Sequence, residues 1–224
     1  MVNFSASEEN YIKAIYHLQN EDGNVTTNEL AARLNSKPAS ITDMMKKLKT
    51  RKLVHYQPYQ GFRLTAEGKK IALGIIRRHR LWEFFLAEKL KFNWDEVHEV
   101  AEHMEHVSSK KLIDKLDEFL GFPKFDPHGD PIPDVNGKME INKQLNLSDW
   151  PLNKQATVCR VINQTPELLD LLHHKKISLG TRLEVTKKFD YDESVEIKIN
   201  KQAPITISRQ LAKTIFVNHG SAVA

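Results

Sequence analysis

A proline-rich segment separates two regions of this 224-residue chain that differ in the spacing of their apolar residues. Five of the nine prolines lie between Gly121 and Pro151. Because proline lacks a backbone donor and ends helices, we expect an irregular, proline-rich linker at residues 123–153. Apolar residues recur at helical spacing before this segment and alternate in short runs after it. We therefore expect a chain that is mainly α with small β, with the β part after the linker.

The N-terminal residues predict three helices followed by a hairpin. Residues 7–19 carry apolar residues at helical spacing, and Thr26–Glu29 fits a capping box that begins a second helix. Pro38 is favoured at the first position of the next helix, and a Gln60-Gly61 turn separates two short strands. Two helices joined by about four residues and followed by a hairpin are typical of a winged helix-turn-helix. Any small α/β domain could show the same order, so this alternative stays open.

Charge is distributed unevenly along the chain, although the net charge is only +4. Eight cations and one anion, Asp43, lie between Arg33 and Arg63, on the expected second helix of the motif and its wing. Contact with DNA phosphates requires cations at these places. Between Glu83 and Glu118 there are ten acidic residues and only five basic ones. This acidic, histidine-bearing segment suggests that its partners are cations.

The remaining segments predict a helical middle region and a small barrel. Residues 69–120 are helical in pattern, and such apolar-rich helices are the usual material of a dimer interface. Short alternating runs from residue 156 to residue 217 suggest an SH3-like β-barrel. The expected domains are a winged helix-turn-helix at 1–70, a helical metal-binding and dimerisation domain at 71–122, the linker, and the SH3-like domain at 154–219.

The single cysteine, Cys159, excludes an intramolecular disulfide and favours a reducing, cytoplasmic setting. We see no apolar run long enough for a membrane span and no secretory signal. Neither a Walker loop nor a G-x-G-x-x-G, H-E-x-x-H or G-x-S-x-G motif occurs. We therefore do not expect an enzyme, and a metalloenzyme is the last of the alternatives.

Histidines and carboxylates cluster at helical spacing in the acidic segment. If a helix runs through His106, then His98, Glu102, Glu105 and His106 share an arc of about 100°. His79 and Glu83 form a further pair, four residues apart on the preceding helix. Imidazole and carboxylate without thiolate suit Mn, Fe, Co or Zn. A solvated, charged helix face is the alternative interpretation.

Taken together, these motifs resemble those of the DtxR/MntR family of metal-dependent repressors, over nearly the whole chain. The matching motifs are Tyr11-Ile12-x-x-Ile15-Tyr16, Ser40-Ile41-Thr42, Leu64-Thr65-x-x-Gly68, Arg77-Arg78-His79-Arg80-Leu81-x-Glu83, Glu105-His106 and Pro127-His128-Gly129-Asp130-Pro131-Ile132-Pro133. The resemblance implies a homodimer that binds a palindromic operator, with a FeoA/SH3-like domain at the C-terminal end. It also implies control of manganese or iron homeostasis genes.

The resemblance implies two metal sites. The primary site maps onto Asn10, Glu102, Glu105 and His106, and the ancillary site maps onto His79, Glu83 and His98. Either Gln164 and Glu167 or Asp126 and His128 complete the ancillary site, and the choice stays open. Glu102 is the manganese-type residue, so Mn²⁺ is favoured and Fe²⁺ is next. Asn10 departs from the usual Asp, and Lys13 stands where the shorter manganese sensors have Glu.

The helix over residues 38–50 is expected to enter the major groove of DNA. Residues near its start would reach base edges: Lys37, Pro38, Ala39, Ser40, Thr42 and Asp43. Lys46, Lys47 and the wing residues Tyr59 and Arg63 would contact phosphate. Asp43 could equally be a charge that is favourable at a helix N-terminus. A metal-independent winged-helix regulator remains the alternative function.

Overall fold

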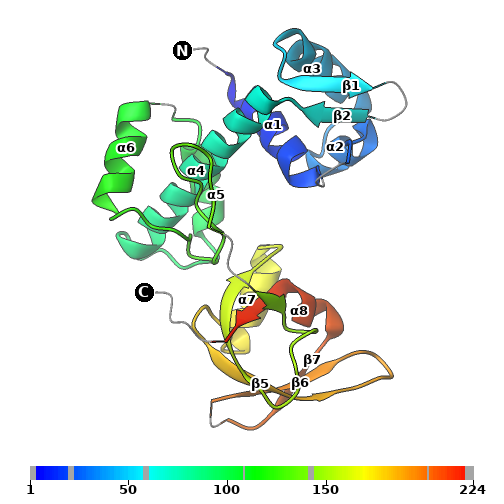
Figure 1. The fold of residues 1–224 in the computed structure, drawn as a ribbon, viewed down its shortest axis with the longest axis vertical. Coiled ribbons are helices and arrows are strands. Elements are labelled where there is room, and N and C mark those ends of the chain that lie inside the picture. The colour runs from blue at the N-terminus through cyan, green and yellow to red at the C-terminus, as the bar shows by residue number, and fades with distance from the viewer. Residues whose placement is uncertain are drawn as a thin grey trace. The chain divides into compact units, whose positions relative to one another are not determined.

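The computed structural model describes residues 4–19, 23–57, 61–107, 109–140, 144–200 and 202–219. Figure 1 shows its helices and strands. The chain divides into two compact units. The first unit comprises Met1–His79, Glu102–Leu116 and Pro133–Met139. The second comprises Arg80–Ala101, Asp117–Ile132 and Glu140–Ala224. Among the helices of the described residues, none has the length and apolar character that a membrane crossing requires.

The winged helix-turn-helix expected at the start of the first unit is confirmed. Its elements are α1 (Ala6–Leu18), α2 (Thr27–Arg33), α3 (Pro38–Thr50), β1 (Val54–Gln57) and β2 (Gly61–Leu64). Thr26 and Glu29 form the predicted capping box, and Pro38 occupies the first turn of α3. The core contains fully buried Ile12, Leu30 and Ile41, one from each helix. Burial of these apolar stripes holds the three helices together.

Gly61 connects the wing to the segment before α2. Val25 and Phe62 form a β-bridge outside the named strands, with both backbone hydrogen bonds at 2.8 Å. Gly61 has φ +101°, and a Cβ there would lie 2.4 Å from the Val25 carbonyl oxygen. Only glycine avoids this clash, so the bridge fixes the wing to the helices.

The middle of the chain is helical, as predicted, but one helix ends earlier. Its elements are α4 (Ala66–Glu88), α5 (Val97–Met104) and α6 (Lys110–Phe119). The prediction that a helix runs through His106 is wrong, because α5 ends at Met104 and a turn follows. The Val107 N–H donates to the Met104 carbonyl, three residues back, which closes that turn. Glu105 and His106 therefore lie beyond the helix rather than on its face.

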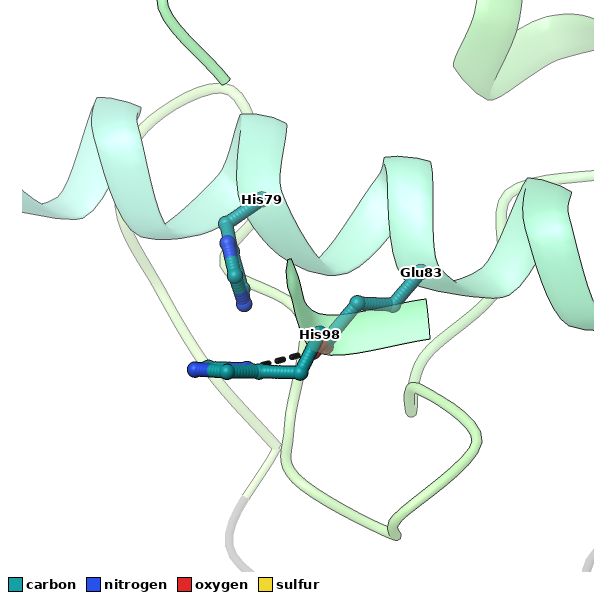
Figure 2. Close-up of side chains that lie close together, drawn as sticks. All are labelled: His79, Glu83 and His98. Atoms are coloured by element: carbon teal, nitrogen blue, oxygen red, sulfur yellow. Dashed lines mark hydrogen bonds and ion pairs between the residues drawn. The ribbon is translucent and has the colours of Figure 1, made fainter. Parts of the chain in front are cut away.

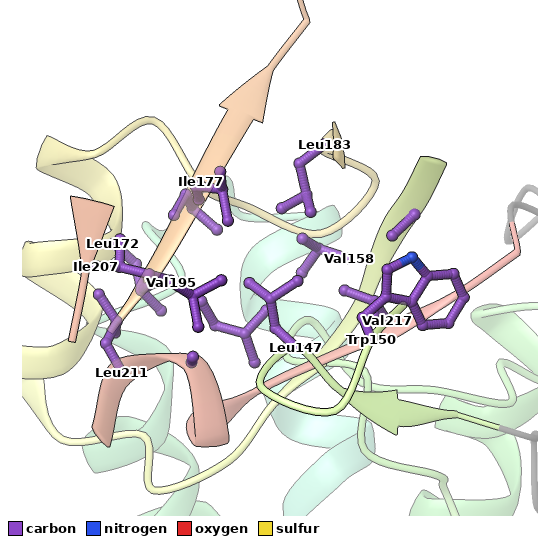
Figure 3. Close-up of a cluster of buried hydrophobic side chains, with 14 of the residues drawn as sticks. Leu147, Trp150, Val158, Leu172, Ile177, Leu183, Val195, Ile207, Leu211 and Val217 are labelled. Carbon is purple, nitrogen blue, oxygen red and sulfur yellow. The ribbon is translucent and has the colours of Figure 1, made fainter. Parts of the chain in front are cut away.

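A six-stranded antiparallel sheet in the second unit forms the predicted small β domain. Its strand order is β3-β8-β4-β5-β6-β7. Figure 3 shows its packed core, in which Leu147, Trp150 and Val158 are almost fully buried. The elements are β3 (Leu145–Asn146), β4 (Gln155–Val161), α7 (Pro166–His174), β5 (Arg182–Lys188), β6 (Val195–Ile199), β7 (Ile205–Ile207), α8 (Arg209–Thr214) and β8 (Ile215–Asn218).

Ordered structure extends into the segment that the sequence predicted as a linker. Strand β3 pairs with β8, and both Leu147 and Trp150, which follow β3, contribute to the core of the sheet. Phe125 and Pro131 form a β-bridge around the Pro-His-Gly sequence. Helix α8 was not predicted either. The domain boundaries given above remain predictions.

Candidate metal centres and DNA-binding surface

Glu105 is a fully buried carboxylate in the first unit with several cationic or donor partners. Lys13 Nζ on α1 lies 2.7 and 2.8 Å from its two oxygens, and His79 Nδ1 lies 2.7 Å from Oε2. Burial alone would raise the pKa of Glu105, but His79 and Lys13 outweigh it, so the pKa lies below its usual value. Glu105 is therefore a carboxylate anion, the form that binds a metal ion.

His106 faces α1 from the turn after α5. Its Nδ1 lies 2.7 Å from Glu9 Oε2, and the other oxygen of Glu9 accepts a 2.7 Å hydrogen bond from Arg78 Nη2. Glu9 is buried, whereas Asn10, the residue predicted from sequence, is exposed. Consecutive helical residues point about 100° apart, so the two side chains leave α1 in different directions. The structure brings Glu9 to His106, and sequence reasoning missed Glu9.

Glu102 lies on α5 at the edge of the same group and is half exposed. Its Oε1 is 3.3 Å from Lys13 Nζ. We call Glu9, Lys13, Glu102, Glu105 and His106 the primary cluster. Lys13 contacts two of its three carboxylates, and the third, Glu9, contacts the imidazole of His106. These carboxylate and imidazole donors suit a divalent transition metal.

The three residues predicted for the ancillary site lie close together (Figure 2). His79 and Glu83 are one turn apart on α4, and His98 Nδ1 on α5 lies 3.0 Å from Glu83 Oε1. Figure 2 shows the His79 ring directed toward the space beside His98 and Glu83. One ligand atom from each of the three residues lies within 4.8 Å of the other two. This spacing is short enough for the three side chains to share one ion.

A further group in the second unit contains Glu83, Asp126 and His128, all of them buried. His128 Nε2 lies 2.7 Å from the Trp94 carbonyl oxygen, so Nε2 carries the hydrogen and donates it. Its Nδ1 is buried, lies 4.0 Å from Glu83 Oε2 and has no hydrogen-bond partner among the residues that the structure describes. Burial lowers the pKa of His128, which favours the neutral ring. A neutral imidazole with a free nitrogen is the form that ligates metal.

Asp126 shapes the loop that presents His128. Its Oδ1 accepts hydrogen bonds from the backbone N–H groups of His128 (2.8 Å) and Asp130 (2.9 Å). Burial raises the pKa of Asp126 well above its usual value, and the charges of Asp130 and Glu83 raise it further, against the opposing effect of Arg80. A buried group with this excess of carboxylates is stabilised by a bound cation.

Gln164 and Glu167, the other candidates for the ancillary site, have different surroundings. Gln164 Nε2 donates to Asp130 Oδ2 at 2.8 Å. Glu167 is exposed in the first turn of α7, where a backbone hydrogen bond lowers its pKa. Of the two arrangements left open by the sequence, the structure brings Asp126 and His128 to Glu83.

The DNA-contact residues predicted on and before α3 are all exposed. These are Lys37, Pro38, Ala39, Ser40, Thr42, Asp43, Lys46 and Lys47. Asp43 Oδ1 lies 3.2 Å from Lys46 Nζ, and Lys47 Nζ lies 3.4 Å from Glu8 on α1. On β2, Arg63 is exposed between buried Phe62 and Leu64. Tyr59 falls outside the described residues.

Three family models match successive parts of the chain. They are the iron-dependent repressor N-terminal DNA-binding domain over residues 3–62, the iron-dependent repressor metal-binding and dimerisation domain over residues 65–134, and the FeoA domain over residues 145–219. Together, the three matched ranges cover nearly all of the described helices and strands.

Relatives and solved structures agree with these matches. An HTH-type transcriptional regulator MntR of Oceanobacillus iheyensis is 35% identical over 150 residues, which cover 67% of this chain and 96% of the relative. A diphtheria toxin repressor of Corynebacterium efficiens is 30% identical over 187 residues, covering 79% and 81%. A manganese-dependent transcriptional repressor in complex with manganese has a TM-score of 0.83 at 32% identity, covering 94% of this chain and 98% of that one.

Proposed function

The chain belongs to the DtxR/MntR family of metal-dependent transcriptional repressors, and we propose that a divalent metal ion switches its binding to operator DNA. The family combines a DNA-binding domain with a metal-binding and dimerisation domain, and its members are repressors rather than enzymes. The observation that carries the proposal is the convergence of Glu9, Glu105 and His106 from segments up to 97 residues apart. A metal bound there would tie α1 to the turn after α5.

For the primary site we propose Glu102, Glu105 and His106, with Glu9 as the ligand from α1. Asn10 was the sequence-based candidate, but burial and the 2.7 Å contact with His106 support Glu9. The metal would supply a further link between two elements that already meet through contacts of Lys13 with Glu105 and of Glu9 with His106. The metal would then favour the conformation that binds DNA, because it binds that conformation more tightly than the other.

For the ancillary site we propose Glu83, Asp126 and His128. The support is the buried Nδ1 of His128, which has no hydrogen-bond partner among the described residues and lies beside Glu83, with Asp126 in the same group. Glu83 also belongs to the group with His79 and His98. These two histidines are the alternative partners of Glu83, and Gln164 and Glu167 have no comparable support.

We propose Mn²⁺ as the preferred metal and Fe²⁺ as the next. Both clusters offer carboxylate and imidazole donors. Cys159 is placed elsewhere, with its Sγ 3.4 Å from the Phe216 carbonyl oxygen, so thiolate selection of a softer metal is not supported. Mn²⁺ is the weakest binder of the first-row series, and carboxylate number and geometry would therefore have to provide its selection.

Two protomers would place α3 in successive major grooves of a palindromic operator. The exposed residues from Lys37 to Asp43 would face base edges, and Lys46, Lys47 and Arg63 would contact phosphate. For Asp43, an ion pair with Lys46 competes with a base contact. Phosphate contacts of this kind give affinity that falls as salt rises.

Fluorescence anisotropy on a palindromic promoter duplex tests the proposal. The protein is measured in chelator, then with Mn²⁺ and with anaerobic Fe²⁺ titrated separately. We expect binding to appear only with metal, with the lower midpoint for Mn²⁺. Glu105→Gln should abolish the metal response, whereas Glu67→Gln, at an exposed position on α4, should keep it. Equally tight binding in chelator would instead identify a metal-independent winged-helix regulator.

A further inference from the structure

Lys13 is the lysine of the primary cluster and contacts two of its carboxylates. It lies on α1, four residues after Glu9, and its side chain is only 14% exposed. Its ammonium group contacts both oxygens of Glu105, at 2.7 and 2.8 Å, and lies 3.3 Å from Glu102 Oε1. A single cation of the protein therefore contacts two of the three carboxylates that are proposed to bind the metal.

We propose that Lys13 is an internal competitor of the metal ion, a residue that sets how much metal the repressor needs. This inference rests on the proposed function. With the metal absent, the ammonium neutralises the buried Glu105, which also has His79 Nδ1 at 2.7 Å and His106 Nε2 at 3.9 Å as neighbours. An uncompensated buried carboxylate is costly, so the lysine stabilises the metal-free protein.

Competition follows from the oxygens that Lys13 uses. A transition metal binds carboxylate oxygen at about 2.0–2.2 Å, inside the space that the ammonium occupies. Both Glu105 oxygens already accept from Lys13, and Oε2 also contacts His79 Nδ1. The ammonium must therefore withdraw before a metal can coordinate Glu105 and Glu102 together. The free energy that this withdrawal costs reduces the apparent affinity for the metal.

The other charged group at the cluster does not compete in this way. Arg78 Nη2 contacts Glu9 Oε1, and its Nε donates to the backbone carbonyl of Glu105 rather than to the carboxylate. Arg78 leaves the Glu105 carboxylate oxygens to Lys13 and His79. Lys13 is thus the cation whose removal frees the carboxylates without disturbing the bond between Arg78 and Glu9.

Three variants test the inference through Mn²⁺ binding, measured as loss of the electron paramagnetic resonance signal of free Mn²⁺. Lys13→Gln removes the charge, Lys13→Arg keeps it, and Lys69→Gln removes the same charge from an exposed position on α4. The Mn²⁺-binding sites that wild type has and Glu105→Gln lacks are assigned to the primary cluster. We expect Lys13→Gln to bind Mn²⁺ there about tenfold more tightly, a typical coupling strength. Lys13→Arg and Lys69→Gln should bind no more tightly than wild type.

Urea unfolding in chelator provides the second readout. Lys13→Gln should be less stable than wild type without metal and should regain stability when Mn²⁺ is added. If it does not fold in chelator, Mn²⁺ should restore its folding, because the metal takes over the role of the ammonium. A purely structural lysine would instead lower both metal-free stability and Mn²⁺ affinity, and that result would overturn the inference. Tighter Mn²⁺ binding by Lys13→Arg would also overturn it.

Failure of the inference can be told apart from failure of the proposed function. Unchanged Mn²⁺ affinity in Lys13→Gln, with wild-type DNA binding still dependent on metal, refutes only the role of Lys13. Absence of Mn²⁺ binding in both proteins refutes both.

Discussion

Glu8 and Glu9 are neighbours in the first turn of α1, but they contact different partners. Glu8 completes a capping box with Ser5 and contacts Arg51 Nη1 and Lys47 Nζ at the end of α3. Glu9 contacts His106 in the primary cluster. One turn of α1 therefore touches both the recognition helix and the proposed metal ligands. If a metal binds as proposed, this turn would connect the metal ligands to α3 through neighbouring side chains.

Replacing Glu8 by Gln should lower the free energy of unfolding by about 2 kcal/mol near neutral pH, because it removes the buried carboxylate that pairs with Arg51 and Lys47. Burial alone would raise the pKa of Glu8, but Ser5 and Arg51 hold it below the usual 4.5. The stabilisation is therefore complete above about pH 4.5 and is lost as the pH falls through the lowered pKa. Urea unfolding of both proteins at several pH values measures this.

Glu29→Gln is the matched control for Glu8→Gln. Glu29 completes the same kind of capping box with Thr26 but is exposed. Glutamine can also serve in a capping box, so this variant should change stability by only a few tenths of a kcal/mol. Equal losses in the two variants would show that the contacts of Glu8 with α3 contribute nothing.

Cys159 should react slowly with thiol reagents. Its Sγ lies 3.5 Å from Gln144 Oε1 and 3.4 Å from the Phe216 carbonyl oxygen, and burial raises its pKa to about 11. At about pH 8 roughly one thiol in a thousand is then the reactive thiolate. Labelling with a disulfide reagent should be slow in the folded protein and fast in urea. Labelling as fast as that of free cysteine would contradict this placement.

At the level of single residues, the structure and the sequence-based prediction differ in which side chain of α1 lies beside His106. The sequence-based prediction selected Glu83 and His128, which the structure brings together with Asp126, and Glu105 and His106, which lie beside Lys13 and Glu9 respectively. It chose Asn10 rather than Glu9. A helical pattern shows which positions are apolar, but Glu9 is a buried acid beside that stripe, and its partner lies 97 residues away. No local pattern reports such a distant partner.

Among the structural elements, the loop at residues 126–130 contributes Asp126 and His128 to the proposed ancillary site. The Asp126 carboxylate accepts hydrogen bonds from two backbone N–H groups of the loop. The backbone N–H of Val161 in β4 donates to the His128 carbonyl oxygen at 2.9 Å. Gly129 has φ +83°, and a Cβ there would lie 2.0 Å from the Cys159 carbonyl oxygen. The loop can approach β4 this closely only because residue 129 is glycine.

Gly129→Ala should therefore displace the loop and move His128 away from Glu83. We expect a loss of about 2–4 kcal/mol in unfolding free energy and loss of the corresponding Mn²⁺ sites, measured by urea unfolding and by Mn²⁺ titration. Gly180→Ala is the matched control. Gly180 has φ +78°, but nothing lies within 4 Å of its Cβ position, so only backbone strain of about 1 kcal/mol is expected. Intact Mn²⁺ binding in Gly129→Ala would remove the loop from the proposed site.

The elements that were predicted correctly have strong local signals, and those that were missed do not. The Thr26–Glu29 box and Pro38 mark helix starts, and α2 and α3 begin there. Strand β3 has two residues, too few to show alternation, and it exists because β8 pairs with it. Helix α8 has six residues, fewer than two turns. Tertiary contacts decide such short elements, and a sequence pattern cannot register them.

At the scale of the whole molecule, each proposed site joins distant segments of its own unit. Glu9 and His106 lie in the first unit, and Glu83 and His128 lie in the second. A metal that binds the folded state stabilises it by mass action, by about 2.7 kcal/mol at a hundred times the dissociation constant. The two sites should therefore act as separate stabilisers of the two units.

Calorimetric unfolding with increasing Mn²⁺ should show a rising midpoint temperature that chelator reverses. His128→Ala should remove the part of the rise that belongs to the second unit, and Glu105→Gln the part that belongs to the first, because each deletes ligands of one site only. His174→Ala, at an exposed position on α7, should keep the full rise. A midpoint that does not move at any Mn²⁺ concentration would show that neither cluster holds the ion. Equal losses in both variants for both units would show that the two sites are coupled rather than independent.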